Sequence, residues 1–186
     1  MKRRRLFKKG DTQKFLLFFI RLFSDNPLPL QETTHMFDIR EDDLSGEQTR
    51  ALLALHLDRM HAFSPPGHAL DFSGLATPEV TVWTAWHQGH IAGIGALKML
   101  SSDTGEVKSM RTHPDFLRKG VGTAILETII ATAKKRDLRR LSLETGSGAA
   151  FDPALSLYHR HGFETGDAFG SYTCNDFTRC LHLDLR

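Results

Sequence analysis

The sequence has few cysteines, no repeats and no long apolar run, and each absence excludes a class of protein. Its 186 residues include two cysteines, Cys174 and Cys180, whose spacing forms neither a CxxC pair nor a disulfide framework. A disulfide-rich secreted scaffold is therefore excluded, and a reducing, cytoplasmic location is expected. The strongly apolar segment 14–23 is interrupted by Arg21 and is far too short to span a bilayer.

Positive charge is concentrated at the start of the chain. Residues 1–35 hold eight lysines and arginines against three acidic residues, so they carry +5 and the remainder carries −3 of the total +2. The later domain is therefore not basic, and we expect no nucleic-acid partner. Residues 1–35 are predicted to be an extension, either disordered or upstream of a true start at Met36. A membrane-surface helix stays an alternative.

Residues 36–186 are predicted to form one mixed α/β domain. Alternating and helical apolar periodicities, with glycine and proline at the breaks, define its elements. Strands are expected at 37–40, 80–86, 91–97, 106–112, 141–144, near 163 and at 178–185, and helices at 47–60, 122–136 and 154–161. The second and third strands flank Gln88-Gly89 and should form a hairpin. Gly93 and Gly95 lie inside a strand, where glycines indicate a bulge or tight packing.

The start of the helix at 122–136 carries the clearest chemical signal. The first N–H groups of a helix have no internal partners and lie at the positive end of its dipole, so they can bind phosphate. Gly120 and Gly122 allow a bulky pyrophosphate to approach the backbone, and Arg118 and Lys119 add positive charge. Neither a Walker A loop nor the GxGxxG dinucleotide fingerprint is present.

The residues around these glycines resemble a motif of the GNAT superfamily of N-acetyltransferases. That family has (Arg/Gln)-x-x-Gly-x-(Gly/Ala) between its fourth strand and the following helix, and Leu117–Gly122 matches it except at Leu117. The first position of the motif contributes mainly its backbone N–H. A second segment, Leu157–Phe163, is similar to the family's Leu-Tyr-x-x-x-Gly-Phe. The resemblance covers about residues 36–186, and 106–112 and 141–146 look closest to bacterial YsnE-like N-acetyltransferases.

The resemblance implies the GNAT acyl-CoA N-acyltransferase fold, a mixed and mostly antiparallel central sheet flanked by helices. It also implies acetyl-CoA as co-substrate, with the pyrophosphate on the helix start and the pantetheine arm along the preceding strand. The expected cofactor-binding residues are Met110, Arg111, Thr112, Leu117, Arg118, Lys119, Gly120, Val121, Gly122 and Thr123.

Two residues are expected to move protons. In enzymes of this family the tyrosine at the position of Tyr158 can protonate the departing thiolate; the alternative is a tyrosine whose ring packs in the core. Glu106 is the candidate base that takes a proton from the attacking amine, since the histone-acetylating branch places its glutamate at a similar spacing. The alternatives are an exposed carboxylate paired with Lys108, or a chain of waters acting as the base.

Ten histidines raise the question of a metal, but no cysteine or carboxylate cluster completes a ligand set, and we expect no metal. The predicted activity is acetyl transfer to a primary amine of a small molecule or peptide. The alternative is a binding module that holds acetyl-CoA without turnover. The acceptor should bind between residues 58–74 and the later loops. Whether the protein forms a homodimer stays open.

Overall fold

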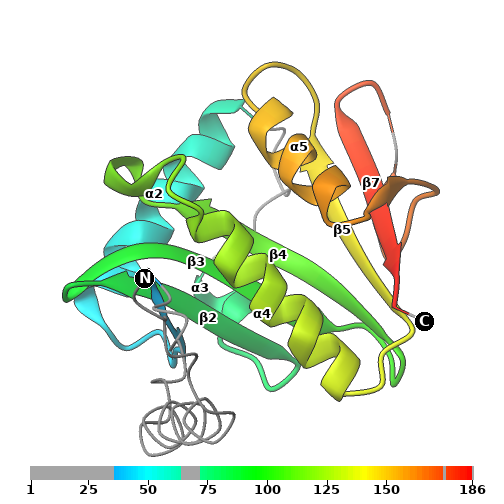
Figure 1. Cartoon of the computed structure of the whole chain (residues 1–186). Helices are drawn as coiled ribbons and strands as arrows, with labels where there is room; N and C mark the ends of the chain where they lie inside the picture. The colour runs from blue at the N-terminus through cyan, green and yellow to red at the C-terminus, as the bar shows by residue number, and fades with distance from the viewer. Residues whose placement is uncertain (1–35, 64–71, 174, 186) are drawn as a thin grey trace, which may run out of the picture. The chain divides into compact units, whose positions relative to one another are not determined.

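The computed structural model describes residues 36–63, 72–173 and 175–185, which form a seven-stranded sheet with helices on both faces (Figure 1). The strands are β1 (Asp38–Glu41), β2 (Val80–His87), β3 (His90–Met99), β4 (Thr104–Thr112), β5 (Arg140–Gly146), β6 (Glu164–Thr165) and β7 (Thr178–Asp184). The helices are α2 (Glu47–Phe63), α3 (Phe72–Leu75), the 3-10 helix η1 (Pro114–Phe116), α4 (Val121–Lys135) and α5 (Asp152–Arg160). These elements lie close to their predicted ranges, and the predicted fold class is confirmed.

The strands follow the order β1-β2-β3-β4-β5-β7-β6 across the sheet. Every neighbouring pair is antiparallel except β4 and β5, which run parallel because α4 carries the chain between them. The expected hairpin is present, with Gln88 and Gly89 both at positive φ in the turn between β2 and β3. The sheet is therefore mixed and mostly antiparallel, as the family resemblance implied.

The β4–β5 contact is short and opens toward one end of the sheet. Backbone pairing joins only Thr104–Glu106 to the residues Arg140–Ser142. Beyond Glu106, β4 continues with β3 as far as Thr112, while β5 continues with β7 as far as Gly146. The two strands therefore diverge from a common vertex at Glu106 and Ser142, as Figure 1 shows. Residues 110–112 therefore lie beyond the part of β4 that pairs with β5.

A bulge changes the direction of the β4 side chains just past this vertex. Lys108 pairs with Ala96, but Arg111 pairs with Ile94, so β4 has one more residue than β3 over this stretch. Ser109 has a φ of 52°, which marks the bulge. The extra residue brings Met110 onto the face covered by α4, where its sulfur lies beside the backbone of β3.

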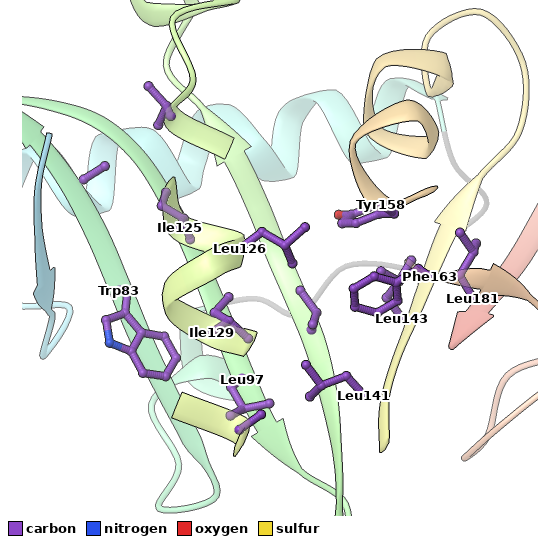
Figure 2. Close-up of a cluster of buried hydrophobic side chains, with 14 of the residues drawn as sticks. Trp83, Leu97, Ile125, Leu126, Ile129, Leu141, Leu143, Tyr158, Phe163 and Leu181 are labelled. Atoms are coloured by element: carbon purple, nitrogen blue, oxygen red, sulfur yellow. The ribbon is translucent and has the colours of Figure 1, made fainter. Parts of the chain in front are cut away.

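Two apolar cores lie on opposite faces of the sheet. Figure 2 shows the larger one, in which Ile125, Leu126 and Ile129 of α4 pack on the sheet and reach Tyr158 and Phe163. The smaller core lies under α2 and contains Leu52 and Leu53 with apolar residues of β2 and β3. Val107 belongs to the α4 core, so its neighbours Glu106 and Lys108 project from the opposite face.

Gly93 and Gly95 let α4 approach the sheet closely. A Cβ on Gly93 would lie 2.4 Å from Val121 Cγ1, and a Cβ on Gly95 would lie 2.6 Å from Ile125 Cγ2. Both distances are shorter than real side chains tolerate, so larger residues would push the helix outward. The tight packing predicted for these two glycines is confirmed, and it holds the start of α4 in place.

We predict that a chain beginning at Met36 folds cooperatively, because charge and composition separate residues 1–35, which lie outside the described residues, from the domain. Thermal unfolding and acetyl-CoA binding of the 36–186 chain, compared with the full chain, measure this. Equal midpoints and equal affinities are expected. An unfolded 36–186 chain would show that the apolar residues of segment 14–23 belong to the core.

Candidate active site

The start of α4 presents a row of backbone donors without acceptors. Among the backbone hydrogen bonds of the described residues, none uses the N–H of Arg118, Gly120, Val121, Gly122 or Thr123 as donor. The helix has no side-chain cap, since its first flanking residue is Gly120. Positive φ values of 60° at Arg118 and 86° at Gly120 curve the loop, a geometry that gathers N–H groups around an anion. The residues present therefore fit a pyrophosphate.

The two motif glycines differ in what they do. A Cβ on Gly120 would meet nothing within 4 Å, and its φ of 86° disfavours any side chain. A Cβ on Gly122 would instead lie 3.1 Å from Leu157 Cδ2 and 3.9 Å from Thr112 Oγ1. The missing side chain of Gly122 thus also makes room for α5, and the approach of a pyrophosphate to its backbone stays a prediction. Only Gly120 faces open space.

The side chains of this loop point outward. Leu117 is 55% exposed, which suits a motif position that contributes through its backbone. Arg118 is also exposed, and Lys119 lies over the ring of Phe116, with Nζ 5.2 Å from the ring centroid. Thr123 is half-buried in the first helical turn. Arg118 and Lys119 therefore put two exposed cations in the loop that leads into α4.

Residues 110–112 of β4 lie past the stretch of the strand that pairs with β5. Arg111 and Thr112 pair with β3, on the other side, and neither Met110 nor these two residues pairs with β5. An extended amide-containing chain can add to such an edge by backbone hydrogen bonds. The pantetheine arm of coenzyme A carries two amides, so this edge fits it. His113, next along the chain, donates its N–H to Ala92 O of β3 at 2.8 Å and so continues the contact with that strand.

Tyr158 lies on α5 beside the start of α4. Its neighbour Leu157 packs against Gly122, which ties the two helices together. Its ring is buried 5.8 Å from that of Phe163, and in Figure 2 the hydroxyl oxygen points away from Phe163 toward β4. Burial raises the pKa of Tyr158, and the nearby Glu144 carboxylate raises it further. The phenol therefore stays protonated at neutral pH, as a proton donor must.

Glu106 lies at the vertex where β4 and β5 diverge, and it is buried. Its Oε1 accepts a hydrogen bond from Lys108 Nζ at 2.6 Å and another from Tyr172 Oη at 2.7 Å. The alternative of an exposed carboxylate is therefore wrong, because the side chain is only 5% exposed, while the pairing with Lys108 is confirmed. Among the described residues Oε2 accepts no hydrogen bond, so one carboxylate oxygen remains for a ligand or a water.

Sequence reasoning missed two residues of this site. Tyr172 comes from the irregular segment between β6 and β7, where no periodicity indicates which way a side chain points. Glu144 lies on β5 two residues past the vertex, on the same face as Ser142, and acts on the pKa of both tyrosines. Strand alternation could have placed Glu144 on that face, but only the structure brings it near Tyr158.

His56 and Arg111 lie on the face of the sheet covered by α2. His56 is buried, and burial lowers its pKa to about 4, with the positive charge of Arg111 as the second cause. Its imidazole is therefore neutral at neutral pH. Of the region predicted for the acceptor, residues 58–63 belong to α2, and residues 64–71 lie outside the described residues.

The histidines near α5 act as caps. Nδ1 of His159 lies 2.9 Å from Phe163 O, and Nδ1 of His161 lies 2.8 Å from Leu157 O. Because a carbonyl only accepts, each Nδ1 carries the hydrogen. No group of three or more histidine, cysteine or acidic residues that could hold a metal ion occurs within the described part of the chain.

Comparisons with known proteins identify the family. The sequence profile of the acetyltransferase (GNAT) family matches residues 34–163. The chain is 46% identical over 152 residues to the uncharacterized N-acetyltransferase YedL of Escherichia coli (strain K12), covering 81% of this chain and 96% of YedL. It is 48% identical over 136 residues to the uncharacterized N-acetyltransferase YsnE of Bacillus subtilis (strain 168), covering 72% of this chain and 90% of YsnE. The chain belongs to the GNAT family of acetyltransferases, enzymes that use acetyl-CoA as acyl donor.

Solved structures share the fold over most of the chain. A Klebsiella pneumoniae protein assigned as an acyl-CoA N-acyltransferase matches with a TM-score of 0.69 and 28% identity, covering 81% of this chain and 99% of that one. A GNAT family acetyltransferase from Elizabethkingia anophelis, solved with acetyl-CoA bound, matches with a TM-score of 0.59 and 18% identity over the same shares. None of the helices in the described ranges is long and apolar enough to cross a membrane.

Proposed function

We propose that the protein transfers the acetyl group of acetyl-CoA to a primary amine of a small molecule or peptide, by direct attack of the amine on the thioester. The observation that carries this proposal is the short β4–β5 pairing, which opens a gap in the backbone ladder beside the uncapped start of α4. The buried carboxylate of Glu106 lies where that gap begins.

In this proposal acetyl-CoA is bound by backbone groups of two elements, the start of α4 and the edge of β4. The pyrophosphate accepts hydrogen bonds from the N–H groups of residues 118–123, with Arg118 and Lys119 adding positive charge. The pantetheine amides pair with the open edge of β4 at residues 110–112. The thioester then lies near the vertex of the two strands, between Tyr158 and Glu106.

The protons balance with these two residues. An alkyl amine is mostly protonated at neutral pH, so Glu106 accepts a proton through Oε2 before or during attack. The amine nitrogen then bonds to the carbonyl carbon, and the tetrahedral intermediate collapses with loss of the thiolate. Tyr158 donates its phenolic proton to the departing sulfur, and the second proton that the attacking nitrogen loses passes through water to the tyrosinate. The raised pKa keeps the phenol protonated until the thiolate leaves, but it also makes the phenol a weaker acid than the coenzyme A thiol, so the proposed role rests on the position of Tyr158 and not on its pKa.

An amine screen tests the reaction class. Full-length protein is incubated with acetyl-CoA and a panel of amino acids, polyamines, aminoglycosides and peptides with free N-termini, and products are detected by mass spectrometry. We expect one class of primary amine to gain the mass of an acetyl group, with equimolar release of coenzyme A. Tight acetyl-CoA binding without acetylation of any panel member would favour the non-catalytic binding module.

Replacing Glu106 by glutamine should alter the pH dependence of catalysis. Glutamine keeps an oxygen that accepts from Lys108 and Tyr172 but cannot take a proton from the amine. We expect kcat/KM to fall by about 10²–10³-fold and its acid limb to change, since that limb reports the free enzyme's base. Steady-state kinetics across pH measure this, with thermal unfolding as a check on folding.

The control for Glu106→Gln is Glu144→Gln, which removes the charge of the other carboxylate that acts on Tyr158 and Tyr172. If Glu106 is the base, Glu144→Gln leaves the acid limb in place. A shift of the limb in Glu144→Gln alone would assign the base to Glu144. If the acid limb of kcat/KM is unchanged in both variants, neither carboxylate is the base, and water takes the proton from the amine.

A further inference from the structure

The segment 166–173, between β6 and β7, is held against the sheet. Nε2 of His182 on β7 donates to Asp167 O at 2.9 Å. The ring of Phe169 lies 5.7 Å from that of His182 and 5.1 Å from that of Tyr172. Tyr172 also donates its N–H to Phe169 O at 3.1 Å, which closes a turn. These contacts place the phenol of Tyr172 over the face of the sheet that carries Glu106.

Tyr172, Glu106 and Lys108 form a closed triangle of hydrogen bonds. Tyr172 Oη donates to Glu106 Oε1 at 2.7 Å, and Lys108 Nζ donates to the same Oε1 and to Tyr172 Oη, both at 2.6 Å. Lys108 Nζ also lies 5.3 Å from the centroid of the Tyr172 ring. These three hydrogen bonds hold the three side chains in fixed positions relative to one another. Both hydrogen bonds to the carboxylate are made to Oε1.

We propose that Tyr172, together with Lys108, positions the Glu106 carboxylate for proton transfer, so that segment 166–173 forms part of the catalytic centre. This inference rests on the proposed role of Glu106. With both hydrogen bonds on Oε1, Oε2 is the carboxylate oxygen to which no described residue donates. Tyr172 acts only through Glu106 and is a positioning residue.

Several charged or titratable groups surround this triangle. Lys98 is the partner of Glu106 on β3, and Glu144 follows the vertex on β5. His182 and Cys180 of β7 are the partners of Ser142 and Glu144. On α2, His56 is a buried titratable group that senses the charge of Arg111. Among these described residues, Lys108 and Tyr172 alone make hydrogen bonds to Glu106.

The Tyr172 phenol stays a donor throughout the pH range in which enzymes work. Burial raises its pKa, and the hydrogen bond to Glu106 and the charge of that carboxylate raise it further. A donor that never ionises stabilises the charged form of Glu106 at every working pH. Removing the hydroxyl should therefore make the carboxylate easier to protonate.

The variant Tyr172→Phe tests the inference, because it removes the hydroxyl and keeps the ring against Lys108 and Phe169. Losing one hydrogen bond to a charged group changes the protonation equilibrium of that group by about tenfold. We therefore expect the acid limb of kcat/KM to move to higher pH by about one unit, with kcat falling and KM for acetyl-CoA unchanged. The pH profiles of kcat/KM are measured on the full chain, with the amine that the screen shows to be acetylated fastest.

Two comparisons separate positioning from a plain structural effect. Phe151→Leu weakens a ring contact with Phe177 that lies outside segment 166–173, and it should lower the unfolding midpoint without moving the acid limb. In a Glu106→Gln background, Tyr172→Phe should cause no further shift, since the residue through which it acts is gone.

The outcomes are distinguishable. A shifted limb in Tyr172→Phe that disappears in the double variant supports the positioning role. An unmoved limb in Tyr172→Phe, where Glu106→Gln does change it, overturns the positioning role and leaves the proposed base intact. If Glu106→Gln itself leaves the limb unchanged, the base assignment fails and this inference fails with it.

Discussion

Replacing Gly120 by valine is expected to weaken acetyl-CoA binding by about 100-fold or more. The open space at the missing Cβ is where the pyrophosphate would approach the N–H groups of α4. A valine there blocks that approach, and each charge-assisted hydrogen bond lost costs about 1.5–3 kcal/mol. Two such bonds already account for the expected change. Isothermal titration calorimetry with acetyl-CoA measures it.

A second glycine of the chain supplies the control. Gly89 also has a positive φ, 81°, and also meets nothing within 4 Å of a Cβ, but it lies in the β2–β3 turn. Gly89→Val carries the same backbone strain and should lower the unfolding midpoint similarly, while acetyl-CoA affinity stays unchanged. Wild-type affinity in Gly120→Val would show that the pyrophosphate does not bind at the start of α4.

Tyr158→Phe is expected to lower kcat while acetyl-CoA affinity stays nearly unchanged. A general acid is worth about 10²–10⁴-fold in rate. We expect the lower end of this range, because coenzyme A has a thiol of pKa about 8–9 and its thiolate already leaves readily. The hydroxyl acts mainly in the transition state, so its loss appears in kcat rather than in binding.

The fold should tolerate this change well. Phenylalanine keeps the ring contact with Phe163 and the packing in the α4 core, and it removes only the hydroxyl. Single-turnover kinetics measure the acetyl-transfer step directly, so that product release does not mask the effect. A single-turnover rate equal to that of the wild type would show that Tyr158 is not the general acid and only packs in the core.

The parts of this site that the sequence predicted are those determined by local rules. A helix must begin after Gly120 because apolar periodicity starts there, and its first N–H groups lack partners wherever the helix lies in the fold. The backbone roles of residues 118–123 therefore need no tertiary information. The position of Tyr158 followed from its motif, and the structure adds that α5 rests on Gly122.

The parts that the sequence did not predict depend on contacts between distant segments. Glu106 looked like the end of an exposed strand, but the segment carrying Tyr172 covers it. The bulge at Ser109 depends on how β4 registers against β3, which periodicity alone does not reveal. In the same way, only the folded chain shows that Gly122 packs against Leu157 while Gly120 faces open space.

A crystal structure of the full chain with acetyl-CoA tests the central claim most directly. We expect the pyrophosphate oxygens within hydrogen-bonding distance of the N–H groups of residues 118–123. The pantetheine amides should pair with β4 at residues 110–112, and the sulfur should lie beside the Tyr158 hydroxyl. A pyrophosphate bound away from the start of α4, or a sulfur remote from both Tyr158 and Glu106, would contradict the account.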